Sequence, residues 1–186
     1  MRSIALKTTV PARVPALALA LLLLAALAGC RQARPAAEQE AAARSLFNET
    51  VEKFHLPSAR ASGPARSALL EKAAAGYQRI LDEFPDATNW DAQAMRSLAN
   101  VRAEQGRLED ALKLYESVAG RYPDENWEIV QSWKSAADLL WDANQLGGAQ
   151  SFYQRIITKF DGTNESAVVK IIVTQSKRRV KEPPTP

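Results

Sequence analysis

Three tyrosines at a constant spacing constrain the fold of this chain more than any other feature. Tyr77, Tyr115 and Tyr153 lie 38 residues apart each time. Each has a leucine seven residues before it, an alanine four residues before it and an aromatic residue seven residues after it. These offsets are near whole turns of an α-helix, so the side chains share one helical face. The repeated residues are Leu70, Ala73 and Phe84, then Leu108, Ala111 and Tyr122, then Leu146, Ala149 and Phe160.

A second amphipathic run lies between consecutive tyrosine helices. Its apolar residues are Met95, Leu98 and Ala99 in one copy and Trp133, Ala136, Ala137 and Leu140 in the next. Each such run begins at Asn-Trp followed by an acid, and we expect Asn89 and Asn126 to be the N-caps. Gly106 and Asn144 should end these helices, because both residue types tolerate the left-handed conformation at a helix C-terminus.

The two ends of the repeat region have their own patterns. Alanine, glutamate and an apolar stripe predict a helix over 37–55 that stops at Leu56-Pro57, and 58–64 is expected to be a loop. The tail over 165–181 places four apolar residues on one side and predicts a final capping helix, although its β-branched run at 168–174 also fits a strand. The four residues are Ala167, Val168, Ile171 and Ile172.

The copy at residues 92–125 resembles a tetratricopeptide repeat. It has leucine, small, glycine, large apolar, alanine, aromatic and proline residues where that motif has them. The matching residues are Leu98, Ala99, Gly106, Leu108, Ala111, Tyr115 and Pro123. The following copy lacks the glycine and the proline, and the period is longer than the usual one because the turns are extended. The resemblance implies an all-α fold over residues 37–181, a right-handed stack of about three helical hairpins with a C-terminal capping helix.

The N-terminal segment follows the order of a bacterial lipoprotein signal. Arg2, Lys7 and Arg13 precede an apolar run over 16–28 that is short for a membrane span. Leu27-Ala28-Gly29-Cys30 then resembles a lipobox, and Cys30 is the only cysteine of the chain. We therefore expect residues 1–29 to be a signal peptide and 30–36 a tether lipidated at Cys30. An ordinary secretory signal with a chance cysteine is the alternative.

The combination of this signal with the repeats resembles envelope lipoproteins of the tetratricopeptide class. The extended turns are similar to those of the repeat lipoprotein in the β-barrel assembly machine and of the TolA-binding coordinator. Arginine follows Cys30, whereas family sorting rules retain lipoproteins at the inner membrane mainly when aspartate follows. The resemblance therefore implies an outer-membrane protein that faces the periplasm in a cell with two membranes.

Composition narrows the possible functions. Three of the 24 Lys and Arg residues precede Cys30 and no acid does, so the remainder carries 21 charges of each sign. This balance gives no support to binding of nucleic acid. Lipidation of Cys30 would leave no thiol for a disulfide, a nucleophile or a metal site.

Catalytic residues are not apparent in the sequence. His55 is the only histidine, so a multi-histidine metal site is excluded, and no nucleophile motif adjoins it. We interpret it as a contact with the negative end of the first helix. The carboxylates Glu109, Asp110, Asp138 and Asp142 lie on polar faces. The sequence predicts a protein that is not an enzyme and holds no cofactor and no metal.

The resemblance also selects candidate partner-binding residues, because the first helix of each tetratricopeptide hairpin lines a groove. These positions are Gln93, Arg96, Asn100 and Glu104 in one copy and Gln131, Lys134, Asp138, Trp141 and Asp142 in the next. Trp141 either anchors a partner or packs against the capping helix, while Trp133 matches a core position. The basic cluster at 176–181 either contacts an acidic partner or lipid, or forms the solvated end of a helix.

Together these features predict a membrane-anchored scaffold that binds an envelope protein or a peptide segment of one. Outer-membrane assembly, division-linked envelope maintenance and secretion or pilus assembly are possible settings. A cell-wall ligand-binding or regulatory accessory of a peptidoglycan enzyme is the alternative. A structural subunit that only self-associates is a third reading.

Overall fold

The computed structural model of the chain describes residues 35–181. The expected signal peptide (1–29), the lipidation residue Cys30, most of the tether (30–36) and the expected disordered tail (182–186) lie outside these residues. The described part is helical and contains no strand. Its elements are α2 (Ala36–Thr50), the π-helical turn η1 (Val51–His55), α3 (Leu56–Ser58), α4 (Gly63–Glu83), α5 (Thr88–Glu104), α6 (Leu108–Arg121), α7 (Asn126–Asp142), α8 (Leu146–Phe160) and α9 (Ala167–Lys181).

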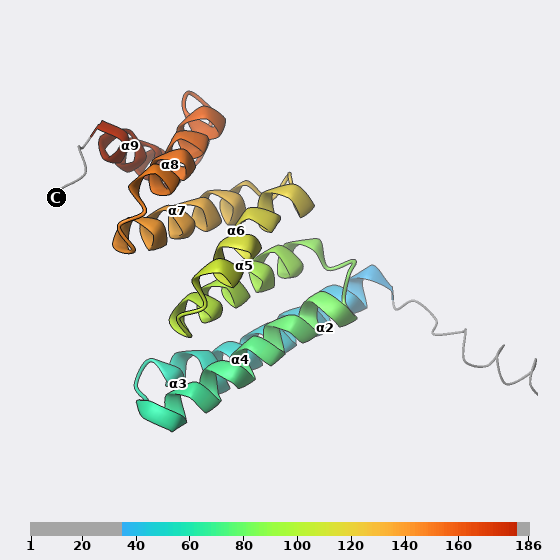
Figure 1. The fold of residues 1–186 in the computed structure, drawn as a ribbon. Helices are drawn as coiled ribbons and strands as arrows, with labels where there is room; N and C mark the ends of the chain where they lie inside the picture. The colour runs from blue at the N-terminus through green and yellow to red at the C-terminus, as the bar shows by residue number, and fades with distance from the viewer. Residues whose placement is uncertain (1–34, 182–186) are drawn as a thin grey trace, which may run out of the picture. The chain divides into compact units, whose positions relative to one another are not determined.

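Consecutive helices pack as hairpins, and the hairpins stack (Figure 1). The pairs are α2 with α4, α5 with α6, and α7 with α8, while α9 packs on α8 and closes the series. This all-α stack confirms the predicted fold class. The first helices also contact one another, α2 with α5, α5 with α7 and α7 with α9. No comparable contact joins α4 to α6 or α6 to α8 within residues 35–181.

The repeated residues form the core. Tyr77, Tyr115 and Tyr153 are each at most 3 % exposed, and the alanines four residues before them are fully buried. The small alanines let neighbouring helices approach closely. Burial of the aromatic rings removes apolar surface from water and is a main source of stability. Trp133, at 7 % exposure, also lies in the core, as its motif position predicts.

The first helix does not stop where the sequence predicted. It continues through η1 into α3, and the chain leaves the helix only after Ser58, so the expected loop at 58–64 shortens to a few residues before α4 begins at Gly63. In a regular α-helix the ring of Pro57 would clash with the carbonyl four residues before it. The wider π-turn immediately before α3 explains how the helix passes this proline.

The predicted N-caps are wrong by one or two residues. Thr88 begins α5 and Asn126 itself begins α7, and neither helix has a side-chain cap. The amide of Asn89 instead donates to Glu125 at 3.4 Å, and that of Asn126 donates to Glu165 at 2.8 Å. Both asparagines thus connect one hairpin to the chain that leads into the next. The predicted C-terminal residues are confirmed, since Gly106 and Asn144 have φ values of 75° and 57°.

The last helix is confirmed as a helix, but of the four apolar residues expected on one side only Ile172 is buried. Val168 and Ile171 are 50 % and 56 % exposed. Six residues separate α8 from α9, whereas four separate α6 from α7. The connection into α9 is therefore longer than the one into α7. The buried residues of α9 are Val169, Ile172, Val173 and Ser176.

None of the helices within residues 35–181 has both the length and the apolar character that crossing a membrane requires.

Candidate binding groove

The predicted groove residues lie on α5 and α7, the two middle members of the contacting series α2, α5, α7 and α9. They occupy equivalent positions in the two copies, because Arg96, Asn100 and Glu104 precede Lys134, Asp138 and Asp142 by one repeat period. All nine predicted residues are at least partly exposed. The two sets nevertheless differ in their contacts, as the α5 residues bind other parts of the fold whereas most of the α7 residues line a hollow.

The α5 set is engaged within the fold. Arg96 Nε donates to the buried carboxylate of Glu128 on α7 at 2.5 Å, and the Arg96 side chain is only 19 % exposed. Asn100 Oδ1 accepts the hydroxyl of Tyr115 at 2.6 Å. In these positions the side chains bind neighbouring helices. Gln93 is half-buried on the same helix.

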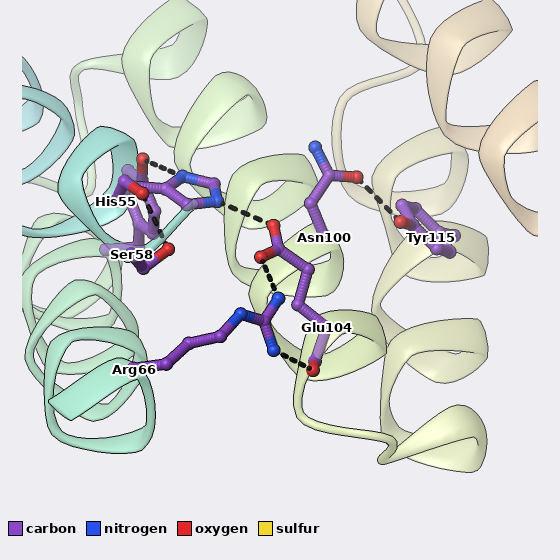
Figure 2. A network of polar contacts seen from close by, with 7 residues as sticks. His55, Ser58, Arg66, Asn100, Glu104 and Tyr115 are labelled. Carbon is purple, nitrogen blue, oxygen red and sulfur yellow. Dashed lines mark hydrogen bonds and ion pairs between the residues drawn. The ribbon is translucent and has the colours of Figure 1, made fainter. Parts of the chain in front are cut away.

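Glu104, the last of that set, is the centre of a polar network (Figure 2). Its carboxylate accepts a hydrogen bond from Arg66 Nη2 at 2.9 Å and lies 3.1 Å from His55 Nε2. Arg66 Nη1 also donates to the Glu104 backbone carbonyl at 3.2 Å. The network joins the first hairpin to the second, since Arg66 comes from α4 and Glu104 from α5.

The interpretation of His55 as a contact with a helix end was wrong. The helix runs past it, and its two ring nitrogens face Tyr77 Oη at 2.8 Å and Glu104 Oε1 at 3.1 Å. Ser58 Oγ donates to the His55 carbonyl at 2.7 Å. The single histidine therefore links η1 to α4 and α5. Only the tertiary packing shows this role, because its partners are 22 and 49 residues away in the sequence.

The α7 set surrounds a hollow of about 600 Å³ between α7, α8 and α9. Four of the five predicted residues on α7 line it, and Gln131 lies one turn before them. Tyr153 comes from α8, and the remaining lining residues come from α9. The lining consists of Lys134, Asp138, Trp141, Asp142, Tyr153, Ile172, Gln175, Ser176, Arg178 and Arg179.

Charged groups on one wall of the hollow neutralise each other. Lys134 Nζ donates to Asp138 Oδ2 at 2.5 Å, and the hydroxyl of Tyr153 donates to Asp138 Oδ1 at 2.7 Å. Burial, and then the neighbouring Asp138 carboxylate, raise the pKa of Tyr153 well above its ordinary value. Asp142 has no hydrogen bond or ion pair within the described chain.

Trp141 packs against the capping helix, which is one of the two roles that the sequence left open. Its ring is edge-on to Tyr153 with centroids 6.3 Å apart, and the Arg179 guanidinium of α9 lies 4.5 Å from its centroid. It packs against the capping helix and also lines the hollow, where it remains partly exposed. A cation over an indole face is a favourable electrostatic contact, which holds α9 against α7 at this point.

The basic cluster of α9 lies partly inside and partly outside the hollow. Lys177 Nζ pairs with Asp161 at 2.8 Å outside the hollow, whereas Arg178 and Arg179 line it. Sequence reasoning did not assign Ile172, Gln175 or these arginines to the groove. The 38-residue period would have found Ile172 and Arg179, which lie 38 residues after Lys134 and Trp141.

A buried carboxylate outside the groove was also missed. Asp91 is 2 % exposed, and one of its oxygens has no hydrogen-bond partner. Burial raises the pKa of Asp91 to about 7. The Tyr122 hydroxyl is also buried without a hydrogen-bond partner in the described chain, and burial, then the nearby Asp91 carboxylate, raise the pKa of Tyr122. No cluster of metal-binding side chains occurs in the described part of the chain.

Comparison with known proteins identifies the repeat. Residues 93–125, which span most of α5 and all of α6, match the tetratricopeptide repeat family model. The chain contains a tetratricopeptide repeat. The match falls on the copy that the sequence motif identified, and tetratricopeptide repeats are typically non-catalytic and bind proteins or peptides. No curated protein and no solved structure matches the chain.

Proposed function

We infer that this protein is a non-enzymatic, membrane-anchored scaffold of the bacterial cell envelope. Its tetratricopeptide stack would bind a segment of another envelope protein, and lipid on Cys30 would hold it at the outer membrane, facing the periplasm. The observation that carries the binding part is the convergence of Lys134, Asp138, Trp141 and Asp142 on one hollow with α9. Positions chosen from the repeat motif alone thus border a single concave site.

The chemistry of the hollow suits a polypeptide ligand. It offers an indole edge, the amide of Gln175 and charges of both signs within one concave surface. Such a mixture can hydrogen-bond a peptide backbone and pair with its side chains, and a partly exposed tryptophan is a frequent anchor in protein interfaces. The Asp142 carboxylate and the Arg178 guanidinium are the charges most available for a partner, because neither forms an ion pair within the described chain.

In-cell photocrosslinking tests the binding role. A photoreactive residue at position 142 should capture one defined envelope protein, identified by mass spectrometry. The same residue at Lys113, exposed on α6, is the matched control and should capture nothing at that yield. Equal capture at both positions, or none at 142, would count against the groove.

Substitution of the lipidation residue tests the anchor. A Cys30→Ser chain should keep its unprocessed mass and leave the outer-membrane fraction, because the thioether that precedes cleavage cannot form. If the variant stays with the membranes at the processed mass, the lipoprotein assignment is wrong and an ordinary secretory signal replaces it.

The alternative function, recognition of cell-wall fragments, predicts a different result. Purified peptidoglycan fragments would then bind the chain, and photocrosslinking from position 142 would capture no protein. The two results together would replace the scaffold function by that of a wall-binding accessory.

A further inference from the structure

Exposed apolar side chains gather at one end of the groove. Trp127, Val168 and Ile171 are 45 %, 50 % and 56 % exposed, and in residues 35–181 Leu56 is the only other large apolar side chain so exposed. Trp127 lies in the first turn of α7, and the other two lie in the first turns of α9. The hydrogen bond from Asn126 to Glu165 holds these two helix starts together. Three of the four exposed apolar side chains therefore lie near the same pair of helix starts.

The apolar end and the hollow share one line along α9. Val168, Ile171, Gln175 and Arg178 are three, four and three residues apart, and side chains at such intervals follow one another on a helix surface. Gln175 and Arg178 line the hollow. Ten residues of helix span about 15 Å, so the surface runs from an apolar end to a charged end over that length.

The charge of α9 indicates what kind of segment fits this line. Residues 167–181 include five cations, Lys170, Lys177, Arg178, Arg179 and Lys181, and no acid. Two such faces would repel each other, which disfavours pairing of α9 with a second copy of itself. The Lys134–Asp138 pair is neutral. Arg178 and Lys181, which lie three residues apart on this line and form no ion pair within residues 35–181, exceed the remaining carboxylate of Asp142. The charged end therefore favours an acidic group.

We propose that the α9 line binds a protein segment with apolar residues at one end and acidic residues at the other. The apolar residues of the partner segment contact Val168 and Ile171, and its carboxylates pair with Arg178. An extended chain covers about 3.3 Å per residue, so about five residues separate the two anchors. This assignment rests on the proposed function, because it specifies the partner of the same groove.

Peptide binding to the full chain in detergent micelles tests the assignment. The probe is a fluorescein-labelled Leu-Leu-Ser-Gly-Ser-Asp-Asp peptide, followed by anisotropy. Its controls replace both aspartates by asparagine or both leucines by serine. The probe should bind saturably, and each control should bind at least about fivefold more weakly. Equal binding of the three peptides would overturn the proposal.

Variants of α9 locate the bound probe. Arg178→Glu should weaken binding about tenfold and Ile171→Gln about fivefold, because both side chains are exposed on the line. Lys170→Glu makes the same change of charge at a residue that lies off the line, and it should change the affinity less than about twofold. An equal loss in Lys170→Glu would indicate unspecific attraction to the basic helix and would reject the site. Displacement of the probe by phosphatidylglycerol vesicles would point to lipid and also reject it.

The photocrosslinking at position 142 separates this proposal from the proposed function. If its partner is captured with unchanged yield in Arg178→Glu and Ile171→Gln, the scaffold function stands and the α9 line is not the contact. If no partner is captured at 142, the scaffold function fails, whatever the peptides do. Capture of a second copy of the chain from position 168 would contradict the acidic partner.

Discussion

The Tyr77 hydroxyl lies 2.8 Å from His55 Nδ1. The equivalent tyrosines of the other two repeats bind a residue of the preceding helix instead. Tyr115 donates to Asn100 at 2.6 Å, and Tyr153 donates to Asp138 at 2.7 Å, each to a residue fifteen positions earlier. The corresponding position before Tyr77 falls outside any first helix. A histidine from the π-turn η1 supplies the polar partner in its place.

Loss of this contact should weaken the first hairpin. Tyr77→Phe removes the buried hydroxyl, and His55→Ala leaves that hydroxyl without its imidazole partner. Each should lower the free energy of unfolding by about 1 kcal/mol. Urea titrations of the two single variants and the double variant measure the coupling. Strictly additive losses would show that the two side chains do not interact in solution.

Gly76 should tolerate no side chain. A Cβ at this position would overlap the hydroxyl and methyl groups of Thr50, whose hydroxyl donates to the Leu46 carbonyl at 2.7 Å. Gly76→Ala should cost about 2 kcal/mol in unfolding free energy through overpacking. Adding Thr50→Ala should restore much of this loss. Gly120→Ala, which meets no atom within 4 Å, is the control and should be neutral or slightly stabilising.

Arg96 should contribute mainly to stability. Arg96→Ala would leave the carboxylate of Glu128, a residue only 5 % exposed, without its cation, at a cost of about 3 kcal/mol. Arg96→Ala combined with Glu128→Gln should recover part of this loss. Arg107→Ala breaks the exposed pair with Asp110 and should cost less than about 0.5 kcal/mol. Similar thermal unfolding of Arg96→Ala and Arg107→Ala would disprove the buried-pair argument.

Asp91 should make stability depend on pH. Burial raises its pKa from 3.8 in the unfolded chain to about 7, so the folded state binds the proton more tightly. The associated stability is present below pH 4 and is lost as the pH rises to about 7. Asp91→Asn should remove this dependence and should be more stable than the original chain at pH 8 by about 2 kcal/mol.

Chemical denaturation at pH 5 and pH 8 measures the effect of Asp91. The gain from Asp91→Asn should be larger at pH 8 than at pH 5. Asp110→Asn, at an exposed carboxylate, is the control. A gain from Asp91→Asn that is the same at both pH values would mean that the carboxyl does not titrate in this range.

The repeat spacing by itself determined the helical hairpins and most of the core. Helical periodicity is local, so a face defined by Ala111 and Tyr115 can be identified without knowing its partner. Gly106 and Asn144 could be assigned for the same reason, because a left-handed residue ends a helix through its own backbone. The groove positions on α7 followed from the motif, and the structure brings four of them to one hollow. The lipid anchor on Cys30 remains a prediction.

Only the tertiary structure decided which of these side chains remain available. Arg96 and Glu104 are residue types that are typical of a binding face. In the fold, however, Arg96 binds Glu128, and Glu104 binds His55 and Arg66. The packing of α9 leaves Val168 and Ile171 exposed and brings Arg178 and Arg179 into the hollow. Such contacts join residues up to 49 positions apart. Local periodicity contains no information about them, because they depend on how whole helices are rotated against one another.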